Sequence, residues 1–137
     1  MNVYVVDASI VLQTSLNESE SVKIFFGKLL KDAEQDKIIL ISSKLLPIEV
    51  ANGLRYGIKD KEELIDTFRD FLKTPIKTLV LTNVQKEKTL EIAFDLGTTV
   101  YDTSYHVLAK AHNAVLLTCD QEYYKRAKEL GDIELII

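Results

Sequence analysis

The stretch that decides the fold is TVYDTSYHVLA (Thr99–Ala109), read together with NAVLLTCD (Asn113–Asp120). The first segment is predicted to open a helix and places Asp102 near its start, and the second is an apolar strand that ends in a turn at Asp120. Acids are favoured at helix N-termini, because the helix dipole there attracts negative charge. Two acids at the ends of successive elements indicate a built site rather than a solvated surface.

Short apolar segments alternate with amphipathic segments along the rest of the chain. Strands are predicted at residues 2–6, 38–41, 78–81, 114–117 and 133–137. Helices are predicted at residues 8–12, 17–33, 47–58, 60–74, 84–96, 102–113 and 120–130. This alternation favours a parallel sheet covered by helices on both faces. The prediction is an α/β fold of three layers, α/β/α, around a central, mostly parallel sheet of about five strands.

The composition is that of an ordinary globular protein. Its 137 residues, 47% of them hydrophobic and 28% charged, fit a single domain over residues 1–137. No apolar run approaches the roughly 20 residues that span a bilayer, and the N-terminal residues lack the basic region of a signal peptide. We therefore expect a soluble, cytoplasmic protein with no membrane partner.

Cysteine and histidine are too scarce to favour a site for a soft metal. Cys119 is the only cysteine, and His106 and His112 are the only histidines. A closed zinc site would need carboxylates to complete it, so a hard cation held by oxygen is the better expectation. The net charge of −4 does not indicate a strongly basic nucleic-acid binder. Carboxylates of a metal site themselves add negative charge, so this acidity argues only weakly against a phosphate substrate.

Two further acids are expected at the same place as Asp102 and Asp120. Asp7 directly follows the first strand, and Glu49 lies in the first turns of the helix that follows the second strand. Ligands of open α/β sheets bind beyond the carboxyl ends of the strands. Four carboxylates at that edge would repel one another unless a divalent cation or protons neutralised them.

Each acid also has a structural explanation when it is taken alone. Asp102 and Asp120 could cap helices, Asp7 could begin an Asx turn, and Glu49 could be an exposed acid favoured by the helix dipole. These explanations do not account for the joint placement of all four acids at one sheet edge. The joint pattern favours a metal site.

Four segments carry a resemblance to a known family: Val5–Ser9, Leu46–Leu54, Tyr101–Ala109 and Leu116–Asp120. Over essentially its whole length the chain resembles PIN-domain proteins, and in particular the small VapC-type toxin ribonucleases of type II toxin–antitoxin systems. The resemblance implies a PIN-like fold with an acidic groove at the carboxyl edge of the sheet. It also implies cleavage of RNA that depends on one or two Mg²⁺ or Mn²⁺ ions.

The resemblance assigns roles to individual residues. The four acidic positions of the family, which are catalytic and bind the metal, fall on Asp7, Glu49, Asp102 and Asp120. The positions that support these acids fall on Ser9, Thr118 and Asn52. We expect the three aspartates to bind the ion directly or through water and Glu49 to orient water, although the sequence does not separate these roles. Thr103 stands where the family more often has alanine, which does not affect metal binding.

Basic residues near the acids are candidates for contacts to the RNA backbone. Lys44 and Arg55 lie beside or on the predicted helix that carries Glu49. Phosphate contacts of this kind add to the salt sensitivity of binding. A solvated helix face is the alternative for each of them. His106 is expected to be a partly buried helix residue rather than a general base, and Cys119 an inert buried thiol.

Two other functions and two protein partners complete the expectations. A phosphoacceptor receiver domain also places acids at strand ends, but Asp7 stands alone after its strand, and no lysine follows the strand at 114–117. A PIN fold kept as a catalytically silent scaffold is the other alternative. The VapC resemblance implies a cognate antitoxin that covers the acidic groove, and a homodimer.

Overall fold

The structure is a computed structural model that describes residues 1–137. Five strands form one sheet: β1 (Asn2–Val6), β2 (Ile38–Ser43), β3 (Ile76–Leu79), β4 (Val115–Thr118) and β5 (Ile133–Leu135). Their order is β3-β2-β1-β4-β5, and every neighbouring pair is parallel. The predicted α/β class with a central parallel sheet of five strands is confirmed.

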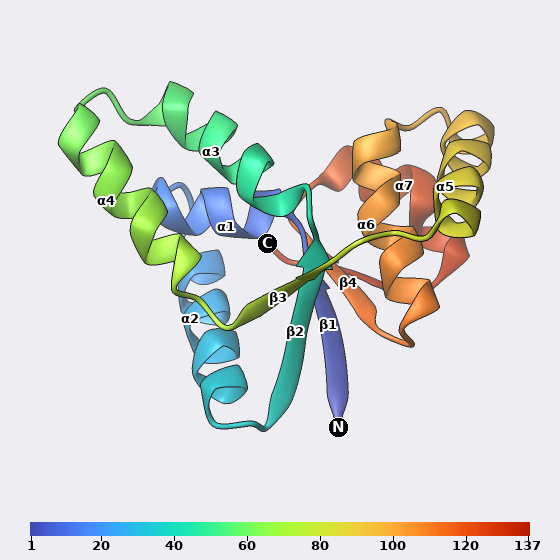
Figure 1. The fold of residues 1–137 in the computed structure, drawn as a ribbon, viewed down its shortest axis with the longest axis horizontal. Helices are drawn as coiled ribbons and strands as arrows, with labels where there is room; N and C mark the ends of the chain where they lie inside the picture. The colour runs from blue at the N-terminus through green and yellow to red at the C-terminus, as the bar shows by residue number, and fades with distance from the viewer.

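Helices cover both faces of the sheet. One layer contains α1 (Ala8–Ser15), α2 (Glu20–Glu34), α3 (Leu46–Gly57) and α4 (Lys61–Leu72) (Figure 1). The other contains α5 (Asn83–Leu96), α6 (Val100–Ala111), α7 (Gln121–Ala127) and the 3₁₀ helix η1 (Lys128–Leu130). None of these helices has the length and apolar character needed to cross a lipid bilayer.

The chain changes direction across the sheet at the boundary between β1 and β4. Strands β1 to β3 are added outward on one side, and the segment after β3 then crosses to the other helical layer before β4 pairs with β1 (Figure 1). Helix α1 follows β1 and helix α7 follows β4, and the two helices belong to opposite helical layers. A crevice at such a switch point is the usual ligand site of an open α/β sheet.

The core is built around the two central strands and α6. Val5 and Val6 of β1 and Leu116 and Leu117 of β4 have almost no exposed surface, as expected for strands covered on both faces. Helix α6 is buried continuously over Thr103–Ala109, so it packs on all sides rather than along one stripe. The stretch quoted first in the sequence therefore lies largely in the core.

Several predicted boundaries differ from those of the structure. Strand β3 is Ile76–Leu79 instead of 78–81, because it pairs with β2 in the register Ser43↔Leu79 and Val80 then leaves the sheet. Helix α2 is capped by Ser19 rather than Asn17, whose φ of 54° is left-handed. Helix α1 runs on to Ser15, three residues past its predicted end at Leu12. The last predicted helix changes to 3₁₀ geometry after Ala127.

Candidate active site

Asp7 and Asp120 begin the two helices that leave the switch point. Asp7 caps α1: its Oδ1 accepts hydrogen bonds from the Ser9 amide at 3.0 Å and the Ile10 amide at 3.4 Å. Asp120 caps α7, and its Oδ1 accepts from the Tyr123 amide at 2.9 Å. Both aspartates are therefore helix caps. Because β1 and β4 are parallel neighbours, both also lie at the same edge of the sheet.

Two hydroxyl groups connect the ends of β1 and β4. Ser9 Oγ donates to Asp7 Oδ1 at 2.5 Å and accepts from the Cys119 amide at 2.8 Å. Thr118 Oγ1 donates to Asp7 Oδ2 at 2.5 Å and accepts from the Asp120 amide at 3.0 Å. Ser9 and Thr118 therefore fix the Asp7 carboxylate from both of its oxygens and tie it to the loop that carries Asp120.

Burial dominates the electrostatics of Asp7. Removal of the carboxylate from water raises the pKa of Asp7 from 3.8 to about 6. The hydrogen bonds from Ser9, Thr118 and Ile10 act in the opposite direction, and the Asp102 carboxylate raises the pKa further. Burial of the Asp7 carboxylate therefore costs folding free energy, and pKa shifts of this kind are common at functional sites.

Glu49 reaches the same edge from the first turn of α3. Its pKa is raised first by burial and then by the Asp102 and Asp7 carboxylates, while the hydroxyl of Tyr105 lowers it. Glu49 Oε1 and the Tyr105 hydroxyl are both buried, and neither meets the geometry of a hydrogen bond. An unpaired buried carboxylate oxygen is unusual and marks a position available for a ligand or a proton.

Asp102 lies at the centre of the acids. Thr99, not Asp102, caps α6, and the Asp102 amide donates to Thr99 Oγ1 at 3.1 Å, which places the side chain in the first helical turn. Burial raises the pKa of Asp102, and the Asp120 carboxylate raises it further. Asp102 and Asp120 line one cleft of about 240 Å³ between the starts of α6 and α7.

The four acids are electrostatic neighbours. Asp102 interacts with the three other carboxylates, and Glu49 also interacts with Asp7. With the side chains as they lie, no three Asp, Glu, His or Cys side chains form a set that could hold a metal ion. The carboxylates of Asp7 and Asp120 instead accept hydrogen bonds from the amides of the helices they cap.

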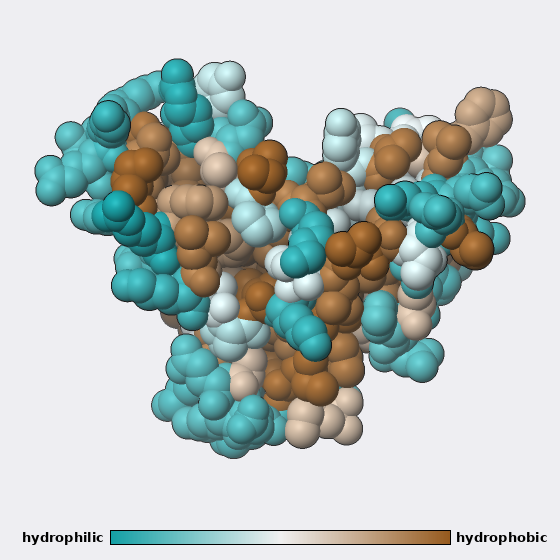
Figure 2. All heavy atoms as spheres, viewed as in Figure 1, coloured by the Kyte–Doolittle hydropathy of each residue, from teal (hydrophilic) through white to brown (hydrophobic).

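The residues present nevertheless fit Mg²⁺. This ion keeps several waters and is commonly bound by only one or two carboxylates, so it does not need a closed cage of protein ligands. Asp102 and Asp120, on their shared cleft, supply such oxygen donors. Figure 2 shows the molecule hollowed between α3–α4 on one side and α5–α7 on the other, above the carboxyl edge of the sheet.

The other predicted residues lie outside the hydrogen-bond network of the acids. Asn52 is exposed on α3 and makes no side-chain hydrogen bond. Arg55 is also exposed, with its guanidinium 5.6 Å from the centre of the Tyr56 ring. Lys44 is exposed in the turn after β2 and lines a separate recess.

His106 and Cys119 have structural environments. The His106 side chain is fully buried, with Nε2 2.7 Å from the Gly131 carbonyl oxygen and Nδ1 2.9 Å from the Tyr123 hydroxyl. Burial lowers the pKa of His106 and raises the pKa of Cys119 to about 12. His106 is thus more deeply buried than expected. Both of its ring nitrogens are occupied, so it is not available as a base.

Sequence reasoning missed two residues that contact the acids. Thr99 caps α6 beside Asp102, and Tyr105 faces Glu49 from one turn further along the same helix. The spacing of three residues between Asp102 and Tyr105 puts them on one helix face, which is the only signal in the sequence. A buried aromatic at that spacing is otherwise indistinguishable from an ordinary core residue.

The PIN domain family matches residues 4–129, which is nearly the whole chain. The chain is a PIN-domain protein. No curated protein matches the sequence of this PIN domain.

Solved structures share the fold of the PIN domain. PAE2754 from Pyrobaculum aerophilum is 26% identical, with 93% of this chain and 87% of PAE2754 covered and a TM-score of 0.65. VapBC2 from Rickettsia felis, in a complex bound to a DNA fragment from its promoter, is 17% identical, with 98% and 99% covered and a TM-score of 0.72. VapBC-1 from nontypeable Haemophilus influenzae is 18% identical, with 97% of each chain covered and a TM-score of 0.65.

Proposed function

We propose that this PIN domain is a metal-dependent endoribonuclease and the toxin of a toxin–antitoxin pair. The observation that carries the proposal is a group of four carboxylates at the switch point of a PIN fold, in which Asp102 interacts electrostatically with Asp7, Glu49 and Asp120. Membership of the PIN family favours nuclease chemistry over a phosphoacceptor receiver. The acidic edge favours an active enzyme over a silent scaffold, because buried acids without a catalytic role would only lower stability.

Each acid has a distinct task in this proposal. Asp102 and Asp120 hold the Mg²⁺ or Mn²⁺, directly or through water, and Asp7 completes the set from the position that Ser9 and Thr118 fix. When bound, such an ion lowers the pKa of water and stabilises charge on phosphoryl oxygens. Glu49 orients the attacking water beside these acids, and its pKa is raised by burial and by the Asp102 and Asp7 carboxylates.

Removal of metal tests the enzymatic half of the proposal. Purified protein is expected to cut RNA with Mg²⁺ or Mn²⁺, to lose this activity in excess EDTA, and to regain it when the metal is restored. Asp102→Asn should lower cleavage at least a hundredfold, because it removes the carboxylate that neighbours the other three. Asp95→Asn, an exposed acid on α5, is the matched control and should cleave normally. Undiminished cleavage in EDTA would refute the metal mechanism.

The proposal that the protein is a toxin has a separate test. The VapC resemblance of the four motif segments supports a cognate antitoxin, and the shared fold of the VapBC proteins from Rickettsia felis and Haemophilus influenzae is consistent with one. Expression of the chain alone is expected to stop bacterial growth, and expression of Asp102→Asn is not. Normal growth with active nuclease would contradict the toxin assignment and leave the nuclease in place.

A further inference from the structure

We propose that a recess next to the acids binds an unpaired nucleobase of the RNA strand. This inference rests on the proposed ribonuclease function and adds to it a base-binding subsite. The recess has a volume of about 340 Å³ and lies between the ends of β2 and β3, α5 and the start of α6. Its occupant is a base next to the phosphate that lies at the acids.

The walls of the recess suit the flat face of a base. Val80, Val100 and Tyr101 line it, and 65%, 44% and 62% of their respective surfaces are exposed. Large apolar side chains left open in a concave surface are typical of ligand sites. Stacking on an aromatic ring suits every base, because each presents a π-face.

The serine and threonine hydroxyl groups of the recess are already engaged in hydrogen bonds within the protein. Ser104 Oγ donates to the Tyr101 carbonyl oxygen at 2.6 Å, and Thr89 Oγ1 donates to the Gln85 carbonyl oxygen at 2.8 Å. Ser43 Oγ accepts from the Leu45 amide at 3.1 Å. The recess therefore offers mainly apolar surface, and recognition by stacking dominates over recognition of base edges.

Two lysines give the recess a positive charge, in contrast to the negative charge of the nearby acids. Lys44 from the turn after β2 and Lys86 from α5 both line it, both are exposed, and neither takes part in an ion pair. In a chain with a net charge of −4, they are placed to attract the phosphates that flank a bound base. An apolar segment of a protein partner would gain nothing from these two charges, so the lysines favour a nucleic acid.

The recess and the acids share their supporting elements. Tyr101 immediately precedes Asp102 on α6, and Lys44 lies in the short connection from β2 to α3, the helix of Glu49. A base held against Tyr101 therefore lies at the same end of α6 as Asp102. Entry requires an unpaired base, so the subsite selects single-stranded or looped RNA.

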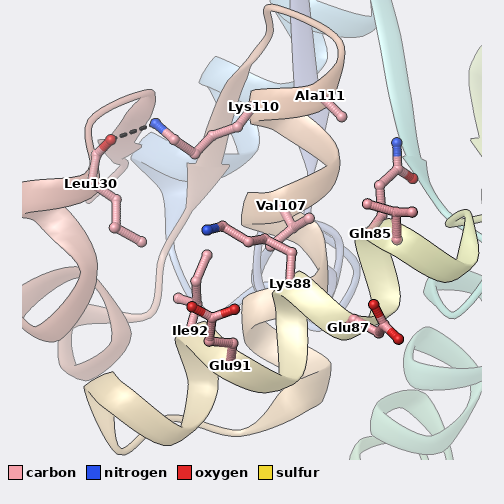
Figure 3. A pocket seen from close by; sticks show the side chains of 10 residues that line it. Gln85, Glu87, Lys88, Glu91, Ile92, Val107, Lys110, Ala111 and Leu130 are labelled. Atoms are coloured by element: carbon pink, nitrogen blue, oxygen red, sulfur yellow. Dashed lines mark hydrogen bonds between the residues drawn. The ribbon is translucent and has the colours of Figure 1, made fainter.

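Helix α5 provides a matched control for the charge of Lys86. Lys88 is exposed on the same helix but lines a different hollow, of about 600 Å³, together with Glu91, Ile92 and Val107 (Figure 3). Substitutions at Lys86 and Lys88 remove the same charge from the same helix. Only the substitution at Lys86 changes the proposed subsite.

Base occupancy is tested with a fluorescein-labelled single-stranded RNA octamer of mixed sequence. Binding is followed by fluorescence anisotropy with Mg²⁺ present, in an Asp7→Asn background that keeps the RNA intact. Replacing one nucleotide by an abasic one is expected to weaken binding about tenfold, which corresponds to about 1.4 kcal/mol. Tyr101→Ala should cause a similar loss, and the two changes together should cost no more than either alone. Losses that multiply, or no sensitive position, would overturn the subsite.

The charges are tested by the salt dependence of binding to the same octamer. Lys86→Gln is expected to reduce the slope of log affinity against log salt concentration by about 0.7, the value for one phosphate contact on a single strand. Lys88→Gln should leave the slope unchanged. Equal slopes for both variants would remove Lys86 from the subsite.

Failure of the subsite and failure of the proposed function give different results. If wild-type protein cuts RNA in Mg²⁺ but no abasic position weakens binding, the enzyme stands and the subsite is wrong. If Tyr101→Ala binds RNA normally and instead loses a protein partner, the recess is a protein-docking site. If the wild type neither binds nor cuts RNA, both proposals fail.

Discussion

At the scale of single residues, burial raises the pKa of three acids of the site, Asp7, Glu49 and Asp102, which are therefore held at a cost to stability. Asp7 is the clearest case, because its pKa is raised from 3.8 to about 6 by burial. The unfolded chain loses this proton at lower pH than the folded protein does. Asp7 therefore stabilises the fold only at low pH, and that contribution is lost as the pH rises through about 4 to 6.

The first prediction follows from the direction of this pKa shift. Asp7→Asn has no charge to bury, so we expect it to be more stable than wild type at pH 7 by about 1–2 kcal/mol, with the difference vanishing below about pH 4. Urea denaturation in EDTA at both pH values measures this, and the same variant should not cut RNA. A variant less stable than wild type at pH 7 would show that the Asp7 carboxylate is not buried at a cost.

The second prediction concerns the unpaired hydroxyl of Tyr105. The Tyr105 hydroxyl faces the Glu49 carboxylate as a dipole but does not meet hydrogen-bond geometry, so Tyr105→Phe should change the free energy of unfolding by less than about 0.5 kcal/mol. The hydroxyl lowers the pKa of Glu49, so its loss should move the acid limb of the pH–rate profile to higher pH.

Tyr4→Phe is the control for Tyr105→Phe. Tyr4 lies on β1 and lines a hollow together with Asn113 and Asp132, which contains none of the four acids, so its substitution should leave the acid limb in place. An unmoved acid limb in Tyr105→Phe would separate Tyr105 from the function of Glu49.

Some of these residues can be predicted from the sequence, and others cannot. Asp7 and Asp120 are visible because each follows an apolar strand directly or within a short turn. Ser9 and Thr118 are suggested only by family resemblance, because a hydroxyl beside an acid has no periodicity of its own. Tyr105 is hidden, since its burial looks the same as that of a core aromatic.

At the scale of elements, local signals compete, and packing decides between them. Ser19 caps α2 although Asn17 lies two residues earlier, because Asn17 adopts a left-handed conformation that turns the chain out of α1. Strand β3 ends at Leu79, although the apolar run continues to Leu81, because its pairing with β2 sets its limits. These boundaries depend on contacts between elements, which a single sequence does not reveal.

The glycines give the third prediction. Gly97 ends α5 with a φ of 69°, and a Cβ there would lie 3.2 Å from Arg126 Nη1, so Gly97→Ala should lower stability by about 1 kcal/mol. Gly27 lies inside α2 with nothing near a Cβ, and Gly27→Ala should raise stability by about 0.5–1 kcal/mol. Thermal denaturation of both variants measures this, and shifts of the same sign would contradict the assigned helix limits.

At the scale of the whole molecule, the order of the strands creates the site. The sequence predicts five strands and their alternation with helices, but it does not predict the order β3-β2-β1-β4-β5. That order makes β1 and β4 neighbours and so joins Asp7 to Thr118 and Asp120, more than a hundred residues away. The family resemblance supplies what local patterns cannot.

The central claim is that acids from four separate elements form one site for one or two divalent cations. Anomalous diffraction from a crystal grown with Mn²⁺ tests this claim most directly. The account predicts an anomalous peak at the carboxyl edge of the sheet, within coordination distance of carboxylate oxygens from at least two of Asp7, Glu49, Asp102 and Asp120. A Mn²⁺ concentration that supports RNA cleavage but gives no peak at this edge would contradict it.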